Sequence, residues 1–291
     1  MSSSRRRPPA RGRRRRASGR RTLLWLVLIL LMVGAVGWAV TREVDRRDDD
    51  AEQVATTQAP PIARFLVREG LRREDVAALL GEETPLSPER YLALTAPGSR
   101  GRALAGTDGP TSLEGFLFPA TYDIGPDTTP ADLVDEQVEA YRQNTAAVDY
   151  SYAESRNLTR YDVLIIASMI EREVQVANER RIVASVIYNR LKQGMRLDID
   201  ATVQYAIGAW KTELTAGDLA VDSPYNTRRF TGLPPGPIAS PGIASIQAAA
   251  NPARTDYLYY VARNDGTGGH YFARTSEQFE RDVQRSRANA G

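Results

Sequence analysis

TRYDVLIIASMIEREV, residues 159–174, is the stretch of this sequence that says most about its fold. Thr159 and Asp162 have the spacing of a capping box, which starts a helix by satisfying its first free backbone N–H groups. From Val163 to Ile170 every residue is apolar or small, on all faces of that helix. A helix that is hydrophobic all round is buried, so the sequence predicts a central helix enclosed by other elements.

The segments on either side of this helix predict a mixed fold. Amphipathic or capped helices are expected at 129–144, 178–194 and 276–287. Strand patterns occur at 115–124, in DYLYYVA (256–262) and in HYFAR (270–274), with the turn NDGTGG between the last two. Helices mixed with a few strands joined by turns indicate the α+β class.

The first sixty residues predict a membrane anchor. Leu23 to Val40 is a run of eighteen apolar or small residues, and a helix of that length spans roughly 27 Å, close to a bilayer core. Ten arginines lie within residues 1–21, which places the N-terminus in the cytoplasm. We therefore expect a single-pass inner-membrane protein with a cytoplasmic Arg-rich tail (1–21), a transmembrane helix (22–41), a flexible linker (42–61) and an extracytoplasmic folded part. A cleaved signal peptide is the alternative, but its apolar region would be shorter and would end in a small-residue cleavage site.

Composition excludes several kinds of chemistry. The chain has a net charge of +2, and its basic excess belongs to the N-terminal tail, so we expect contact with anionic lipid and not with nucleic acid. It has no cysteine and a single histidine, His270. Disulfides, zinc–thiolate sites, cysteine nucleophiles and multi-histidine metal sites are therefore excluded. We expect neither a metal nor a cofactor.

Glu171, at the end of the buried helix, is the strongest candidate for chemistry. A carboxyl group in this position loses water on several sides, which favours its protonated form. A carboxyl group that stays protonated near neutral pH can act as a general acid. The alternative is that Glu171, Arg172 and Glu173 form a solvated run of charges just beyond the buried part.

Three further stretches are candidates for binding. The Gly/Pro-rich loop YNTRRFTGLPPGPIASPG (225–242) carries Tyr225 and Asn226 at its start, and long stiff loops often line binding grooves. Glu114 lies beside two phenylalanines in SLEGFLFPATY, and His270 opens a strand after a glycine-rich turn. For each of these a purely structural role is the alternative.

Several of these stretches together resemble the endolytic murein transglycosylases, the YceG-like family. ASMIEREV (167–174), VASVIYNRL (183–191), MRLDIDATVQYAIG (195–208), the YNT…GLPPGPIASPG loop and GGHYF follow in that family's order. The resemblance covers about residues 62–291. It implies a small LysM-like module at 62–108, lacking part of its usual N-terminal half, and a transglycosylase domain at 109–291.

The resemblance also implies a reaction. Family members cleave the β-1,4 bond between N-acetylmuramic acid and N-acetylglucosamine within nascent glycan strands, leave 1,6-anhydro-N-acetylmuramic acid ends and so limit strand length. Glycan strands and peptidoglycan synthases are the implied partners. The family's catalytic glutamate is the first Glu of S-x-I-E-x-E, here Glu171.

One glutamate suffices for this reaction, because the sugar's own C6 hydroxyl replaces the attacking water that ordinary glycosidases activate. The residues expected to bind substrate or to orient Glu171 are Glu114, Asp200, Tyr225, Asn226 and His270. Two other functions fit the same residues: a muramidase that transfers the glycan to water, and a non-catalytic glycan-binding scaffold of the envelope.

Overall fold

The computed structural model describes residues 63–107 and 111–291, together with Met32 and Gly34. The expected tail, membrane helix and linker otherwise lie outside the described residues, so these three assignments stay predictions. Within the described part of the chain, no helix has both the length and the apolar character needed to cross a membrane. Residues from Pro61 to Gly291 form one compact unit.

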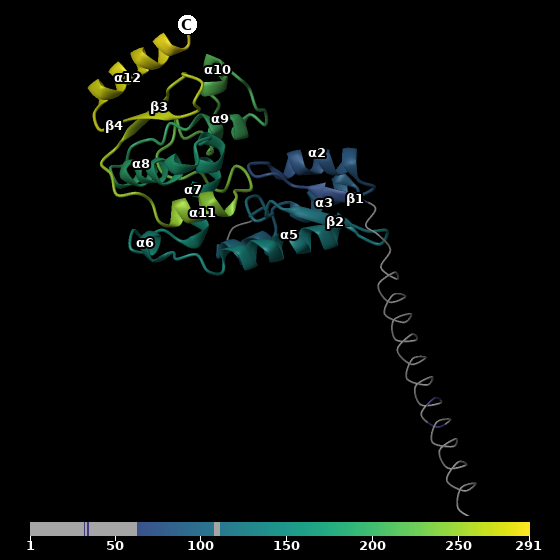
Figure 1. Ribbon diagram of the computed structural model, residues 1–291. Coiled ribbons are helices and arrows are strands. Elements are labelled where there is room, and N and C mark those ends of the chain that lie inside the picture. Colours follow the sequence, from purple (N-terminus) through teal and green to yellow (C-terminus); the bar gives the residue numbers. More distant parts are fainter. Residues whose placement is uncertain (1–31, 33, 35–62, 108–110) are drawn as a thin grey trace, which may run out of the picture. The chain divides into compact units, whose positions relative to one another are not determined.

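This unit is mixed α+β, mostly helical, with two small antiparallel sheets (Figure 1). The strands are β1 (Ala63–Leu66), β2 (Thr121–Ile124), β3 (Tyr259–Ala262) and β4 (His270–Ala273). The helices before the central one are α2 (Arg73–Glu83), α3 (Pro88–Thr95), α4 (Ser99–Ala105), α5 (Pro130–Thr145) and α6 (Ser151–Glu154). The central helix and those after it are α7 (Arg160–Glu173), the short 3-10 helix η1 (Ala177–Glu179), α8 (Arg180–Lys192), α9 (Asp200–Ala206), α10 (Ala216–Leu219), α11 (Ile243–Ala250) and α12 (Ser276–Asn289).

Helix α7 is the centre of the larger hydrophobic core, as its sequence predicts. Its capping box forms: Thr159 Oγ1 accepts from Asp162 N at 3.1 Å, and Asp162 Oδ2 accepts from Thr159 N at 2.7 Å. Every residue from Val163 to Ile170 is buried. Helices α8 and α11 pack against it (Figure 1), so no face of its apolar stretch is left to solvent.

Strand β2 is shorter than the sequence predicts. The strand expected over 115–124 is extended only from Thr121 to Ile124. The preceding residues turn instead, because Gly115 adopts a left-handed φ of 83° and Phe116 N donates to Leu113 O at 3.0 Å. The residues after this turn pair with β1 in antiparallel register.

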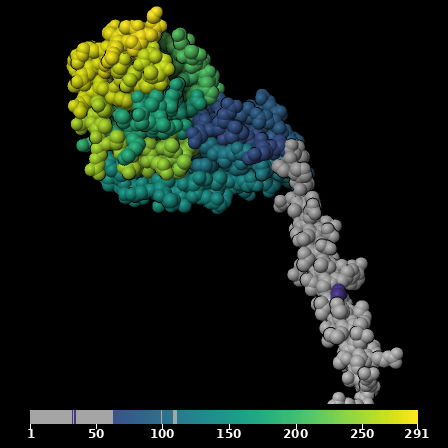
Figure 2. Space-filling view, in the orientation of Figure 1, coloured from purple at the N-terminus to yellow at the C-terminus, as the bar shows by residue number. Residues whose placement is uncertain are grey.

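A second hydrophobic cluster joins the two sides of the predicted domain boundary. Phe65 of β1 lies opposite Tyr122 of β2, and both side chains enter the cluster with Leu80 of α2 and Leu133 of α5. In Figure 2 the blue residues that follow position 63 lie directly against the teal residues of this later segment. A boundary between 108 and 109 would therefore divide one cluster, because the strand that completes the N-terminal sheet comes from later in the chain.

The long loop 225–242 is fastened to the central helix. Ser168, fully buried on α7, accepts from Ile238 N at 3.0 Å and donates to Ile165 O at 2.7 Å. Pro237 packs so closely on Gly115 that a Cβ there would lie 2.7 Å from two atoms of the proline ring. The loop is thus a fixed wall of the fold.

Candidate active site

The C-terminal end of α7 faces a pocket of about 500 Å³. Glu173 of α7, Asp200 of α9 and His270 of β4 line it, together with Tyr260 of β3. The structure therefore brings together two of the predicted site residues, Asp200 and His270. The glutamate that they meet is Glu173, two positions after Glu171.

The surroundings of Glu173 favour its protonated form. Burial raises the pKa of Glu173 above its ordinary value, and the charge of Asp200 raises it further. The backbone N–H of Ala201, the charge of His270 and the Tyr260 hydroxyl act in the opposite direction but do not cancel the rise. The Tyr260 hydroxyl donates to Glu173 Oε2 at 3.3 Å. Such a carboxyl group, lining a pocket, is suited to donate a proton.

His270 is buried and held in one orientation. Its Nδ1 lies 2.7 Å from Glu179 Oε2, and its backbone N donates to Glu179 Oε1 at 3.1 Å. Its ring and the Tyr260 ring pack edge to face, with their centroids 5.3 Å apart. Glu179 thus fixes His270, and His270 in turn supports the tyrosine that contacts Glu173.

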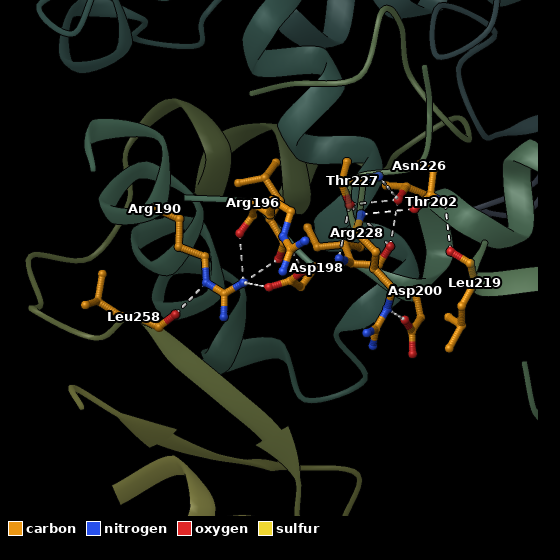
Figure 3. A network of polar contacts seen from close by, with 12 residues as sticks. Arg190, Arg196, Asp198, Asp200, Thr202, Leu219, Asn226, Thr227, Arg228 and Leu258 are labelled. Carbon is orange, nitrogen blue, oxygen red and sulfur yellow. Dashed lines mark hydrogen bonds and ion pairs between the residues drawn. The ribbon is translucent and has the colours of Figure 1, made fainter. Parts of the chain in front are cut away.

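Asn226 builds the loop and does not face the pocket. Its side chain has no exposed surface, and its Nδ2 donates to Leu219 O at 3.0 Å and to Val221 O at 2.9 Å (Figure 3). Its Oδ1 accepts from Arg228 N at 3.0 Å. Because the amide is occupied within the loop, the geometry favours the structural alternative for Asn226 over substrate binding.

The next residue, Thr227, ties the loop to the start of α9. Its hydroxyl lies 2.8 Å from that of Thr202 and accepts from Ile199 N at 3.1 Å (Figure 3). This attachment carries Arg228 to Asp200, and the Arg228 Nε donates to the Asp200 carboxylate. The segment YNTR therefore sets the positions of a charged pair on the pocket wall.

Glu171 lies in different surroundings, because residues two apart on a helix point in directions about 200° apart. It is half-buried, and its Oε2 accepts from Gly242 N at 3.1 Å. The segment after β1 lies close by, since a Cβ on Gly70 would meet Glu171 Cγ at 3.6 Å. Between the two glutamates, Arg172 stacks on Trp210 with 3.8 Å from Cζ to the ring centroid. Glu171 does not line the pocket of Glu173, so its catalytic assignment stays a prediction.

Glu114 and Tyr225 lie in a third place. Tyr225 is half-buried against Tyr205, with ring centroids 4.7 Å apart. Glu114 is 1% exposed; its Oε2 accepts from Arg73 N at 3.4 Å, and its Oε1 has no hydrogen-bond partner among the described residues. Burial raises the pKa of Glu114 to about 8, with a further contribution from the charge of Glu74. Neither Glu114 nor Tyr225 lines the pocket of Glu173.

The replacement Glu114→Gln should make stability less dependent on pH. The folded protein, with a Glu114 pKa of about 8 against an ordinary 4.5, keeps this proton where the unfolded chain loses it. Protonated Glu114 therefore makes its full contribution to the free energy of unfolding below the ordinary pKa. That contribution decreases as pH rises toward the pKa of the folded protein, by at most about 1.4 kcal/mol per pH unit. Thermal unfolding of both proteins between about pH 5 and pH 8 checks this slope. The variant should lose less stability across the range; equal losses would contradict the buried, protonated Glu114.

Sequence reasoning missed Glu173, Tyr260 and Glu179. The signal for Glu173 was present, because it is the second Glu of S-x-I-E-x-E, but spacing alone does not say which of the two faces a pocket. Tyr260 belongs to the predicted strand DYLYYVA, where six consecutive residues are apolar or aromatic and no pattern singles out one of them. Glu179 had no sequence signal, since its partner His270 is 91 residues away.

Sequence comparison identifies relatives of this chain among known proteins. A protein of Bacillus subtilis (strain 168) named endolytic murein transglycosylase is 36% identical over 217 residues, covering 70% of this chain and 60% of that protein. One of the same name from Streptococcus pneumoniae serotype 2 (strain D39 / NCTC 7466) is 40% identical over 177 residues, 59% of this chain and 32% of its own length. The chain thus spans less than two thirds of these curated relatives.

A solved structure and a family model agree with these matches. The crystal structure of a YceG-like protein from Listeria monocytogenes has a TM-score of 0.66 and 33% identity to this chain, and the match covers 80% of each. The model of the YceG-like family matches residues 44–285. Since that match takes in most of the sequence, including every residue of the pocket, the chain belongs to the YceG-like family.

Proposed function

We propose that this chain is an endolytic lytic transglycosylase of peptidoglycan. It cleaves the β-1,4 bond between N-acetylmuramic acid and N-acetylglucosamine within nascent strands, and leaves 1,6-anhydro-N-acetylmuramic acid ends. The observation that carries this proposal is Glu173: a carboxyl group whose pKa burial raises, lining a pocket of about 500 Å³. The names of the relatives from Bacillus and Streptococcus support the reaction class.

A single carboxyl group can serve both halves of the reaction. Protonated Glu173 gives its proton to the glycosidic oxygen as the bond from that oxygen to C1 breaks. The C6 hydroxyl of the same sugar then attacks C1, and the proton of that hydroxyl returns to the Glu173 carboxylate. The two products together have the atoms of the substrate, with no water added. Tyr260, which donates to Glu173 Oε2, orients the carboxyl group through both steps.

Glu173 is our choice over Glu171 as the acid because of where each side chain lies. Glu173 shares a pocket with Asp200 and His270, whereas Glu171 accepts a hydrogen bond from the Gly242 backbone outside that pocket. A proton donor must lie within hydrogen-bond reach of the oxygen that it protonates, and the pocket offers a substrate that position beside Glu173. Glu171 remains the alternative from the family motif, and mutation of each glutamate separates the two.

The wider organisation is also a proposal. The hydropathy of residues 22–41 and the arginines before them support an uncleaved anchor in the inner membrane, with the catalytic domain (109–291) outside the cytoplasm. We place a LysM-like module at 62–108, which shares its sheet and hydrophobic cluster with β2 and α5 of the catalytic domain. Cleavage near the membrane would limit strand length where synthases release new glycan.

The test is product analysis with un-crosslinked nascent glycan. We expect the full-length chain in detergent to produce internal fragments with anhydro ends, each lighter by one water than the hydrolysis product, as mass spectrometry can measure. Fragments with reducing ends would identify a muramidase, an outcome that the other carboxylates in the pocket, Asp198 and Asp200, make worth testing. Intact glycan in the presence of folded protein would overturn both and favour the scaffold.

A further inference from the structure

Two arginines on the pocket wall have hydrogen-bond donors that the described residues do not use. Arg228 donates from Nε to Asp200, and its two terminal NH₂ groups have no acceptor in the described part of the chain (Figure 3). Arg196 lies with Nε 3.7 Å from Asp198 Oδ1, too far for a hydrogen bond. Their side chains are 38% and 57% exposed, so both lie where the pocket meets solvent.

Arg190, the third arginine of the pocket, has a structural role. Arg190 is 8% exposed, and it donates to Leu258 O at 2.6 Å, to Leu197 O at 2.8 Å and to Asp198 Oδ2 at 3.1 Å (Figure 3). Its guanidinium fixes the turn at 196–198. Among the pocket's arginines only Arg196 and Arg228 have substantially exposed side chains, so the donors available to a ligand at the opening are theirs.

The charge of the pocket favours an anion. Its wall holds three arginines and two aspartates, Asp198 and Asp200. The other ionisable groups facing it are Glu173, which the proposed reaction needs in its neutral form, the tyrosines of β3, and His270, which Glu179 pairs with. The positive surplus lies at the opening, and guanidinium groups with free donors bind carboxylates well there.

We propose that Arg196 and Arg228 bind a carboxylate on the substituent of the muramoyl residue whose bond is cleaved, which rests on the proposed function. That sugar differs from its neighbour by the lactyl group on O3, and the stem peptide is attached to this group. When the glycosidic oxygen is at Glu173, the substituent of the same sugar lies within a few ångströms and extends toward the opening. The carboxylate belongs to the peptide in stem-bearing strands and to the lactyl group in denuded strands.

The test is steady-state kinetics of full-length Arg196→Gln and Arg228→Gln on three substrates. These are stem-bearing strands, strands denuded by an amidase, and stem-bearing strands with all carboxylates converted to amides. We expect each replacement to raise KM on stem-bearing strands about tenfold and to leave kcat nearly unchanged, since a charged hydrogen bond to the substrate is lost. On amidated strands the variants and the wild type should have the same KM. A rise on denuded strands as well would identify the lactyl carboxylate as a second partner.

Controls separate recognition from folding. Arg142→Gln should change no KM, because Arg142 is an exposed residue of α5 whose one ion pair among the described residues is with Glu139. Arg228→Lys keeps the charge and should recover part of the loss. An unchanged KM on stem-bearing strands, or an equal rise on amidated strands, would overturn the proposal. If the wild type cleaves none of the strands, the proposed function fails. Binding then tests the carboxylate site separately: the wild type should bind carboxylated muropeptide more tightly than amidated muropeptide, and Arg228→Gln should lose this difference.

Discussion

Glu173→Gln should lower the rate of glycan cleavage by about 10²- to 10⁴-fold, the usual contribution of a general acid. Glutamine keeps the size of the side chain and can still accept the hydrogen bond from Tyr260, which is 3.3 Å in the wild type. It has no proton to give to the glycosidic oxygen and no basic oxygen to take one from O6. The loss should therefore fall on kcat, with KM close to the wild-type value. Single-turnover rates on un-crosslinked strands measure it.

Glu171→Gln is the matched control for this experiment, two residues away on the same helix. Its amide oxygen can still accept from Gly242 N, as Glu171 Oε2 does at 3.1 Å. We expect a loss of less than about tenfold, because only a supporting contact changes. If Glu171→Gln were inactive and Glu173→Gln active, the general acid would be Glu171, the first glutamate of the motif.

Gly115→Ala should destabilise the protein by about 2–5 kcal/mol. Gly115 has φ 83°, where an L-residue costs about 1–2 kcal/mol. The new Cβ would lie 2.7 Å from Pro237 Cβ and Cγ and 3.3 Å from Leu164 Cδ2, and overpacking of this kind adds about 1–3 kcal/mol. Because Pro237 belongs to the loop that carries Arg228, activity should fall with stability. Denaturant unfolding measures the change.

Gly194→Ala separates the two causes. Gly194 has a similar φ of 67°, but no atom lies within 4 Å of the position that a Cβ would take. This variant should lose only the backbone cost, about 1–2 kcal/mol. Equal losses in the two variants would show that the contact with Pro237 contributes nothing.

The buried helix could be predicted from sequence because its evidence is local. The capping box at Thr159 and the run from Val163 to Ile170 lie within twelve residues, and both form as expected. Asp200 and His270 line one pocket, but their role in substrate binding stays a prediction. His270 was a candidate as the single histidine of the sequence, and Asp200 became one through the family resemblance. Sequence patterns of this kind identify the segments that lie together more readily than they identify the side chains that contact one another.

What could not be predicted depends on contacts between distant residues. The pairing of β1 with β2 joins residues nearly sixty positions apart, and it makes a boundary at 108 cross a hydrophobic cluster. Asn226 looked available at the start of a loop, yet it is buried and its amide is occupied by Leu219 and Val221. Glu171 and Glu173 have the same chemistry and nearly the same position in sequence. Their contacts with distant segments distinguish them, because Tyr260 of β3 donates to Glu173 and the Gly242 backbone donates to Glu171.

Mass spectrometry of the glycan products tests whether Glu173 is the general acid. Wild type, Glu171→Gln and Glu173→Gln are compared on the same un-crosslinked strands. We expect anhydro-ended internal fragments from the wild type and from Glu171→Gln, and intact glycan from folded Glu173→Gln. Anhydro-ended fragments from Glu173→Gln at the wild-type rate would contradict this expectation.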